Sequence, residues 1–534
     1  MDLNHKKESP MQGMTGMWGG TGSNLVSGSS GYDPLGYVDD VASWGIYSGD
    51  GNSSSPTIYT GIDFTSTDYS LSGGSLWCNH VEGGGNSDWG IYDTVRGTVN
   101  SDRYKLIQSN YSNATVTHAQ FHCGAFTSSG FKVSDSSECN SNTGQYAFRQ
   151  FRRRAKFHDI VRYTGNGSNQ AIAHSLGTKP GFIIIKNDSS NSIDWVCYHS
   201  HLNGGSSPED YYIQYNNGSN NNAPTAEVNE VGAWNDTAPT ATHFTVGDHQ
   251  DVNKDGDEYM AWIFAGAEDD GGYGENSDES IIKTGEYTGT LDSSSVVDVG
   301  FEPGMLWIKR RDGNGHWLMM DDTSMWPSKP ASNSQDSNYE RTGCNWGRYI
   351  ESSGNYSFCA PKTAASGVKG FTHLNVSDAD YNGSGGKYIY VAIRKLGQRP
   401  AATGSTTGSD LFLTGSDSGN NGGSKQSPVF AADFKVDMAW SGSTSTDKYF
   451  WNQRIGNQNY FYPFQDSALS NHFTYEYNFV KGHVETTQNF SSWESNMFAR
   501  RRKFFTSQAY IGTGSAQTIP HDLGTTPGLI MIKK

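Results

Sequence analysis

The sequence has few of the features that mark disulfide frameworks, zinc sites or membrane insertion. Its six cysteines lie at positions 78, 123, 139, 197, 344 and 359, and no two of them form a Cys-x-x-Cys pair. This spacing indicates neither a zinc site nor a disulfide framework, so we expect free, buried thiols in a chain that folds in a reducing cytoplasm. No run of 18 apolar residues occurs, and no apolar core of a signal peptide follows Met1, so we expect no membrane span.

Positive charge and known catalytic motifs are scarce as well. The net charge is −16, which disfavours binding to the phosphate backbone of nucleic acids. Two basic clusters, at residues 152–154 and 500–502, are expected to be solvated linkers or strand edges. No Gly-x-Ser-x-Gly, phosphate-binding loop or His-Glu-x-x-His occurs, and Asp321-Asp322 has no identifiable partner for a sugar-cleaving carboxylate pair. We therefore expect a protein that is not an enzyme and needs no cofactor.

Glycine and aromatic residues are abundant. The chain contains 64 glycines and 13% aromatic residues, whereas all hydrophobic residues together make up 34%. Small cores built around large rings and separated by polar turns would give this balance. No long segment shows the helical spacing of apolar residues, so the composition favours turn-rich β structure.

One stretch of sequence occurs twice. Residues 163–186 return as residues 510–533 at a constant offset of 347, and a shorter version begins at Tyr287. Residues 182–185 form an apolar run that predicts a strand buried on both faces, and Lys186 is expected to mark its exit to solvent. His174 and His521 share one position in the repeat, and no acid or nucleophile repeats beside them, so we expect turn histidines that bond to nearby backbone.

The repeat divides the chain into modules of domain size. Their openings, at Tyr47, Tyr163, Tyr287, Leu413 and Tyr510, are separated by 116, 124, 126 and 97 residues, which suits β-sandwiches. We predict an all-β fold of tandem β-sandwich (jelly-roll-like) modules with an N-terminal extended arm, and one strand order for modules 1 to 3. The predicted ranges are 1–45 for the arm, 46–157 for module 1, 158–281 for module 2, 282–400 for module 3, 401–505 for the divergent module 4, and 506–534 for the start of an incomplete module 5. The apolar strand expected at residues 527–533 has no sheet of its own, so we expect either a natural chain that continues past Lys534 or packing of this strand on module 4 or on a neighbouring copy.

These motifs resemble a repeat of tail-fibre-like and other virion structural proteins of tailed bacteriophages, notably those of marine bacteria. The resemblance rests on Tyr-Thr-Gly-Asn-Gly-Ser, on His-x-Leu-Gly-x-x-Pro-Gly with its apolar run and lysine, and on the later Asn-x-x-Gly-x-x-Tyr strand. It covers about residues 45–534 and is weakest in module 4. It implies a virion component, made in the host cytoplasm, that has no intrinsic chemistry. We expect a tail fibre or similar appendage, and a homo-oligomer. The alternatives are a receptor-binding module for host-surface glycan and a polysaccharide depolymerase.

Two sets of residues are candidates for binding. Asp251, Asn253, Asp255 and Asp257 have the spacing of an EF-hand loop, but the twelfth position is Trp262 instead of an acid, which favours a hairpin turn over calcium. The N-terminal arm cannot build a core of its own, yet four apolar side chains lie close together in its sequence. We therefore expect these side chains to attach the protein to other virion proteins. These side chains are Met11, Met14, Met17 and Trp18.

Aromatic residues are the remaining candidates. Trp89, Trp195 and Trp317 share a module position inside apolar runs, so core packing is expected before sugar stacking. If a glycan binds, the variable loops are expected to hold it, through Tyr211-Tyr212 with Asn216-Asn217, or through Trp326.

Overall fold

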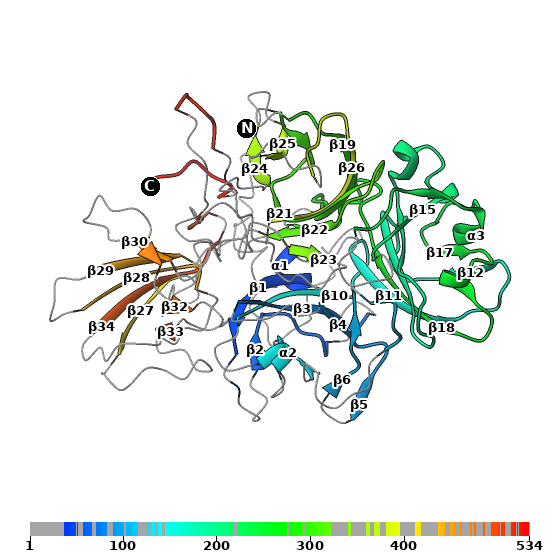
Figure 1. The fold of residues 1–534 in the computed structure, drawn as a ribbon. Helices are drawn as coiled ribbons and strands as arrows, with labels where there is room; N and C mark the ends of the chain where they lie inside the picture. Colours follow the sequence, from blue (N-terminus) through cyan, green and yellow to red (C-terminus); the bar gives the residue numbers. More distant parts are fainter. Residues whose placement is uncertain are drawn as a thin grey trace, which may run out of the picture.

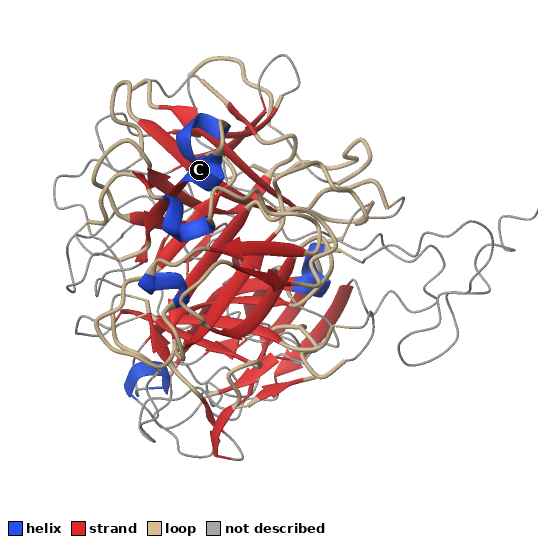
Figure 2. Cartoon of the chain, turned by 90° about the vertical axis from the view of Figure 1, so that its right-hand side faces the viewer, coloured by secondary structure: helices blue, strands red, loops and turns tan. Residues whose placement is uncertain are grey.

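The structure is a computed structural model, and nearly all of its regular structure is β-strand (Figure 2). The residues that it describes are 37–49, 51, 57–66, 71–82, 89–100, 103–109, 111–115, 125–128, 130–133, 137–140, 145–216, 223–274, 277–291, 295–321, 340–342, 359–363, 368–373, 381–395, 412–417, 436–443, 449–453, 459–461, 470–471, 475–476, 484–485, 493–501, 503–507, 514–519, 521 and 523–532. The predicted all-β, sandwich-type fold is confirmed. None of the helices within these ranges has the length and apolar character needed to cross a membrane.

Each of modules 1 to 4 is built on one large antiparallel sheet, and the four sheets have the same strand order. Within each large sheet, the first strand in chain order pairs with the last, the last also pairs with the second, and the remaining strands follow in chain order. In this spatial order the strands are β1 (Ala42–Ser48), β10 (Gln145–Arg152), β3 (Gly74–Glu82), β4 (Gly90–Asp93) and β7 (Ile107–Gln108); β11 (His158–Thr164), β18 (Glu258–Phe264), β13 (Phe182–Asn187), β14 (Val196–His199), β15 (Tyr211–Gln214) and β16 (Val228–Asn229); β19 (Ile282–Thr288), β26 (Lys387–Arg394), β21 (Pro303–Arg310), β22 (Trp317–Asp321) and β23 (Glu340–Thr342); and β27 (Phe412–Asp417), β34 (Trp493–Phe498), β28 (Met438–Ser443), β29 (Tyr449–Gln453), β30 (Asn459–Phe461) and β31 (Ser470–Asn471). The predicted common strand order of modules 1 to 3 is confirmed.

A second, smaller sheet accompanies each large one. These sheets are β2 (Thr57–Tyr59), β9 (Gly130–Lys132) and β8 (Phe126–Thr127); β12 (Gln170–Ala173) and β17 (His243–Val246); β20 (Val297–Asp298), β25 (Lys369–His373) and β24 (Cys359–Thr363); and β32 (Tyr475–Glu476) and β33 (Val484–Glu485). A two-stranded ribbon of β5 (Thr98–Asn100) and β6 (Arg103–Tyr104) projects from module 1. The described helices are single turns: α1 (Val38–Val41), α2 (Ser137–Asn140), α3 (Val231–Trp234), α4 (Gln250–Asn253), η2 (Leu202–Gly205) and η3 (Pro208–Asp210).

The repeated tyrosines hold the opening of each module to its last strand. Tyr163 stacks on its cross-strand partner Tyr259 at a centroid distance of 5.3 Å, and its hydroxyl donates to the Val252 carbonyl at 2.6 Å. The same stacked pair and the same hydroxyl contact recur in modules 1 and 3, as Tyr47–Tyr146 with Cys139 and as Tyr287–Tyr388 with Tyr381. Position 165, two residues after Tyr163, requires glycine, because a Cβ there would lie 2.2 Å from the Lys254 carbonyl oxygen.

Both faces of the large sheets in modules 1 to 3 are buried. In module 3, Leu306 and Ile308 point to the small sheet, where they pack with Phe371, whereas Met305 and Trp307 join a core shared by three modules. We call the face of each large sheet that meets the other modules its inner face. The prediction that residues 182–185 are buried on both faces is confirmed, since all of β13 is buried.

The inner faces of modules 1, 2 and 3 meet in the shared core. Phe151 of module 1 lies 5.4 Å from Phe264 of module 2, Phe264 lies 5.5 Å from Trp307 of module 3, and Trp307 lies 5.6 Å from Phe151, all between ring centroids. Trp77 of module 1 also contacts Trp307, at 5.4 Å. The three sheets therefore form a closed arrangement, the three-module ring, whose blue, green-cyan and green sheets surround one core in Figure 1. Segments 38–41 and 42–45 fall inside the predicted arm, yet Val38 and Val41 belong to this core.

The fourth sheet lies to one side of the ring (Figure 1). The linker after it has the geometry of the linker between modules 1 and 2. Lys156 and Lys503 both have left-handed backbone, with φ of 59° and 64°, and both backbone N–H groups donate at 2.7 Å to the carbonyl of a leucine, Leu176 or Leu523. Residues 529–532 are nevertheless 44–76% exposed and form no strand, whereas residues 182–185 are fully buried. Packing of this segment on module 4, one of the three predicted alternatives, is therefore not found among the described residues.

Three further sequence expectations need correction. Segment 251–257 is not a hairpin turn, because it joins β17 of the small sheet to β18 of the large sheet through α4. The register pairs Leu413 with Met497, so the module 4 residue that matches the opening tyrosines is Asp417, which pairs with Trp493. The basic cluster at 152–154 is not a solvated linker, because Arg152 and Arg154 are 7% and 1% exposed.

Candidate functional site

The interfaces of the three-module ring contain many of the buried polar side chains of the described chain. One such position ends the fourth strand of each module, where Asp93, His199 and Asp321 occupy equivalent places in the register. All three side chains are buried. Each one, directly or through a neighbour, contacts the last strand of the next module around the ring, so these residues mark the three interfaces.

A buried ion pair joins module 3 to module 1. The Arg149 guanidinium Nη2 donates to Asp321 Oδ2 at 2.5 Å, and both side chains are completely buried. The guanidinium also lies over the Trp89 ring, 5.2 Å from its centroid. Two charges removed from water are tolerated when each compensates the other, and separating them leaves an uncompensated buried charge. This pair therefore holds two modules together and closes the ring.

A neutral histidine joins module 2 to module 3. His199 Nδ1 accepts from the His201 backbone N–H at 3.1 Å, so Nε2 carries the proton and donates to the Tyr390 carbonyl at 3.0 Å. Burial lowers the pKa of His199 to about 3, so the imidazole stays uncharged at neutral pH. A general base needs a pKa near the working pH, and His199 does not meet this requirement.

An internal ion pair of module 1 packs against module 2. Arg96 Nε donates to Asp93 Oδ2 at 2.6 Å, and the backbone N–H groups of Val95 and Arg96 donate to Oδ1 at 2.9 and 2.8 Å. The guanidinium carbon of Arg96 lies 5.6 Å from the centroid of Trp262, which belongs to the last strand of module 2. At this one position of the register, the three interfaces therefore use three different kinds of polar contact.

The repeated tryptophans and lysines make contacts in the opposite direction, toward the preceding module. Trp195 Nε1 donates to the Tyr111 carbonyl of module 1 at 2.8 Å, and Trp317 Nε1 donates to the Gln214 carbonyl of module 2 at 2.9 Å. The expected core position of Trp89, Trp195 and Trp317 is confirmed, because all three are fully buried. Their indole N–H groups have a second use that the sequence did not reveal, since two of them link neighbouring modules.

Lys186 follows the same pattern and corrects the expectation that it exits to solvent. It is fully buried, and its ammonium donates to the carbonyls of Ser112 in module 1 and Ile193 in its own module, at 3.0 and 2.6 Å. Burial lowers its pKa to about 8. Lys309, at the equivalent position in module 3, reaches the carbonyl of Thr225 in module 2 at 3.3 Å. The lysine that closes the apolar run therefore joins modules.

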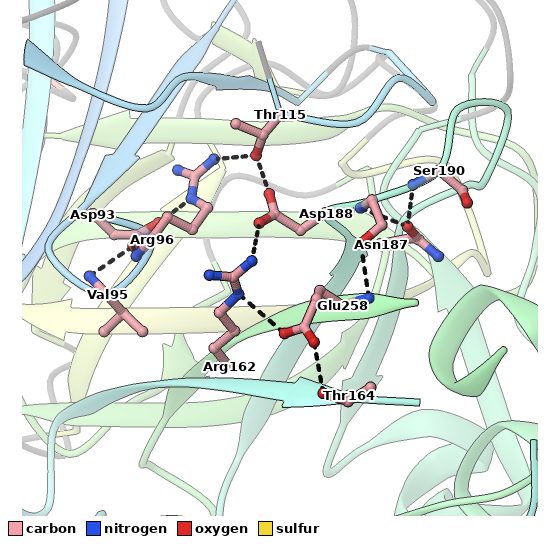
Figure 3. Close-up of polar contacts among 11 residues, drawn as sticks. Asp93, Val95, Arg96, Thr115, Arg162, Thr164, Asn187, Asp188, Ser190 and Glu258 are labelled. Carbon is pink, nitrogen blue, oxygen red and sulfur yellow. Dashed lines mark hydrogen bonds and ion pairs between the residues drawn. The ribbon is translucent and has the colours of Figure 1, made fainter. Parts of the chain in front are cut away.

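A longer polar chain crosses the interface between modules 1 and 2 (Figure 3). Arg96 donates to the Thr115 hydroxyl, which donates to Asp188. Arg162 lies between two carboxylates, with Nη2 3.5 Å from Asp188 and Nε 3.2 Å from Glu258. Positive and negative groups alternate along this chain, so each charge has an opposite neighbour.

This network does not have the arrangement that glycoside cleavage needs. Two carboxylates must flank the scissile bond with space between them for the sugar or water. Asp188 and Glu258 instead share the guanidinium of Arg162, which bridges them (Figure 3). The other expected candidate, Asp321, is buried against Arg149, and Asp322 lies outside the described residues. Asp188 and Asp321 therefore join neighbouring modules, whereas Glu258 bonds to Arg162 and Thr164 of its own module.

The four residues of the calcium hypothesis do not converge on one point. Asn253 is buried, and its Nδ2 donates to the carbonyls of Ser168 and Gly247 at 2.5 and 2.6 Å. Asp255 is exposed, and Asp257 bonds to Asn187 at 2.9 Å. His249 is the partner of Asp251, at 3.9 Å. Within the described ranges, no three His, Cys, Asp or Glu side chains are grouped to hold a metal ion. The geometry assigns Asn253 to holding the opening loop of module 2.

The other candidates have varied outcomes. His174 Nδ1 accepts from the Leu176 N–H at 3.2 Å and His521 Nδ1 from the Leu523 N–H at 3.3 Å, so the predicted turn role is confirmed. Burial lowers the pKa of His174. Asn216, a glycan candidate, is buried, and its Oδ1 accepts a hydrogen bond from the backbone N–H of Trp195 at 3.0 Å. The attachment candidates Met11, Met14, Met17 and Trp18 lie outside the described residues, as do Asn217 and Trp326.

Sequence reasoning missed the residues that join the modules. In the sequence, Asp321 has no recognisable partner, and nothing links it to Arg149, because the two residues lie 172 positions apart. One signal was available: apolar runs without polar alternation, such as residues 182–185, need a cover on both faces. The partner of the second face could have been sought in the neighbouring modules.

Comparison with known proteins adds one match. Residues 153–395 match a protein family described as "Domain of unknown function (DUF7483)". The match covers less than half of the chain, and it runs from the linker before β11 to the residue after β26, which corresponds to modules 2 and 3. Neither the curated proteins nor the solved structures contain a match to the chain.

Proposed function

We propose that this protein is a structural component of a tailed-bacteriophage virion, a tail fibre or similar appendage, made in the host cytoplasm. The observation that carries the proposal is the use of reactive side-chain types for joining modules. Arg149 with Asp321, His199 and Lys186 are all buried and bonded across module interfaces. A chain that commits such groups to internal contacts gains a rigid unit, which is what a particle component requires. The sequence resemblance supports the same assignment.

Particle composition tests the proposal. Phage particles purified from an infected culture should contain the protein at a fixed ratio to the other virion proteins, measured by mass spectrometry. Antibody-gold labelling in electron microscopy should then place it on an appendage of the particle. A protein found in the infected cell but absent from purified particles contradicts the proposal.

The N-terminal arm is proposed to attach the protein to other virion proteins. The structure adds one restriction to the experiment, because Val38 and Val41 are 1% exposed within the ring core. A deletion that tests attachment should therefore end before Tyr37. We expect the deletion of residues 1–36 to leave melting unchanged and to prevent incorporation into particles. Normal incorporation of this shortened chain would refute the attachment role.

Binding of a host-surface glycan is a second candidate, and one observation favours it. Tyr211 and Tyr212 of β15 are partly exposed, and the Tyr212 ring lies 5.7 Å from the ring of His249. Exposed aromatic rings stack on sugars. If this patch binds glycan, Tyr212→Ala should remove the signal on a glycan array while the melting temperature falls only slightly, because the covered part of Tyr212 packs against the shared core. Trp195→Ala should instead lower the melting temperature and have no selective effect on binding.

A further inference from the structure

Two stretches of chain, which we call docking segments, lie along the module that follows them. The docking segments are residues 111–115 of module 1 and residues 223–227 of module 2. The Ser112 carbonyl accepts a hydrogen bond from the Ile193 backbone N–H of module 2 at 3.2 Å. In the same way, the Pro224 carbonyl accepts from the Gly315 backbone N–H of module 3 at 3.2 Å. The two segments therefore dock alike, one module apart.

Most contacts at these two interfaces do not distinguish one receiving module from the other. Lys186 and Lys309 each donate to a backbone carbonyl of the docking segment. Trp195 and Trp317 each donate to a backbone carbonyl of the preceding module. Every peptide segment offers carbonyls, and the inner faces of all three modules are apolar. A contact that is specific for one module must therefore come from other groups.

Charged side chains differ between the two receiving modules. Three equivalent positions of modules 2 and 3, in the first strand, directly after β13 or β21 and in the last strand, carry opposite charges. In this order the pairs are Arg162 and Glu286, Asp188 and Arg311, and Glu258 and Lys387. We call each set of three a charge triad. Module 1 has the uncharged Ile46 and Gln145 at the two strand positions.

Each docking segment complements the triad on which it docks. The Thr115 hydroxyl donates to Asp188, and Arg96 Nη1 of module 1 lies 3.3 Å from the same hydroxyl (Figure 3). In the next interface the polarity is reversed, because Arg311 Nη1 donates to Glu227 Oε1 at 2.5 Å. The Asp188 side chain is 3% exposed, and those of Arg311 and Glu227 are 12% exposed. Water therefore shields these charges little, and a wrong partner is costly.

We propose that the charge triads make each docking segment specific for the module that follows it. A ring of three modules on one chain has two senses of closure, since the segment of module 1 neighbours both module 2 and module 3. On module 3, Thr115 and Arg96 would meet Arg311, and Glu227 would find no cation at the uncharged strand positions of module 1. Specificity of this kind rests on the cost of the wrong pairing. The inference concerns ring closure and is independent of the proposed virion function.

A charge placed in the first docking segment tests the proposal in the full-length chain. Thr115→Glu gives this segment the charge of the second one and places it against Asp188, so the melting temperature should fall by several degrees. The matched control is Thr115→Gln, which has the same length without the charge and should cause a clearly smaller fall. Circular dichroism at low temperature should confirm that each variant is folded.

Reversal of the module 2 triad should change the sign of this effect. The substitutions are Arg162→Glu, Asp188→Arg and Glu258→Lys, which give module 2 the polarity of module 3. In this background Thr115→Glu should raise the melting temperature, because the new carboxylate lies beside the new guanidinium, whereas Thr115→Gln should not. An effect of side-chain size alone would be the same in both backgrounds.

The interface between modules 2 and 3 provides a second test by a double-mutant cycle. Arg311→Asp should lower the melting temperature in the wild-type chain, where it faces Glu227 and Glu286. In the background Glu227→Arg the same substitution should cause a smaller fall. Glu227 also accepts from the Asn203 backbone N–H at 2.7 Å, so only the difference between the two backgrounds measures the charge pairing.

Two results would overturn the proposal. They are equal falls for Thr115→Glu and Thr115→Gln in the wild-type chain, and a fall for Thr115→Glu that is as large after reversal of the module 2 triad as before. If the chain with the reversed triad does not fold, the double-mutant cycle decides. A fall for Arg311→Asp that is the same in both backgrounds then overturns the proposal, and a smaller fall with Glu227→Arg supports it.

Discussion

The three-module ring and module 4 have the same strand order, yet they place different residues on it. In the ring each large sheet is covered by its own small sheet on one face and by two other modules on the other. Its strands are accordingly apolar on both faces, as in β18, where every residue after Glu258 is buried. In module 4 the equivalent strand alternates between buried and partly exposed residues. The pattern along a strand thus reports how many faces of its sheet are covered, and strand order alone does not.

The largest expected difference between the two regions is at the centre of the inner face. Trp307→Ala should lower the free energy of unfolding by about 4–5 kcal/mol, near the top of the range for emptying a buried aromatic site, because Trp307 of module 3 contacts rings from both of the other modules of the ring. Trp440→Ala in module 4 should cost less, about 2 kcal/mol, since part of the Trp440 side chain is already exposed to water. Urea unfolding measures both changes. Equal losses in the two variants would remove the distinction between the inner faces.

The buried ion pair should give the next largest effect. Asp321→Leu leaves the Arg149 charge buried without its carboxylate and should cost about 3 kcal/mol. The matched control is Glu258→Gln, because the Arg162–Glu258 pair, at 3.2 Å, has side chains that are 36% and 35% exposed. Exposed pairs contribute about 0–1 kcal/mol. Thermal unfolding should separate the two variants, and a control as destabilised as Asp321→Leu would contradict the assigned role of the buried pair.

A smaller effect distinguishes the turn role of Asn253 from a metal site. Asn253→Asp removes two donated hydrogen bonds and places a carboxylate beside the carbonyl oxygens of Ser168 and Gly247, so we expect a loss of about 2 kcal/mol. Urea unfolding should be run with calcium and with a chelator. If calcium stabilises the Asp variant more than the wild type, the residue belongs to a metal site instead.

The change of stability between pH 6.5 and pH 5 should give the smallest effect, less than about 2 kcal/mol for one histidine. Burial lowers the pKa of His158 to about 3 from the usual 6.5, so below pH 6.5 the unfolded chain takes up a proton that the folded chain does not. Stability that is present above pH 6.5 is therefore lost as the pH falls toward 3, at most by about 1.4 kcal/mol per pH unit for one histidine. His158→Phe, which places in module 2 the residue found at the equivalent Phe505, should reduce this slope between pH 6.5 and 5. An unchanged slope would show that His158 is protonated in the folded state.

Much of the fold could be predicted from the sequence because its determinants are local. The opening tyrosine and the glycine after it act within one module, through contacts such as Tyr163 with Val252 and Gly165 with Lys254. The turn histidines bond two residues along the chain. Such contacts repeat with the modules, so their spacing reveals both the modules and their common strand order.

The contacts between modules could not be predicted, because their partners lie far apart in the chain and several of them differ from one interface to the next. Asp93, His199 and Asp321 are equivalent in register and have a different partner in each module. Lys186 looked like a residue at the end of a strand because the carbonyl that it reaches, at Ser112, lies 74 positions away in another module. Only the path of the chain in three dimensions brings these groups together, and the ring closure depends on them.

Native-state hydrogen exchange tests the central claim, that modules 1 to 3 are one cooperative unit with a shared core, most directly. Exchange should be followed by mass spectrometry at increasing denaturant for β3, β13, β21 and β28, the strands that pair with the last strand on the interior side of each large sheet. The account predicts that β3, β13 and β21 become exchangeable in one common opening, because each inner face depends on the other two, and that β28 of module 4 opens at lower denaturant. Separate openings for β3, β13 and β21 would contradict it, because they would mean that the three modules are independent domains.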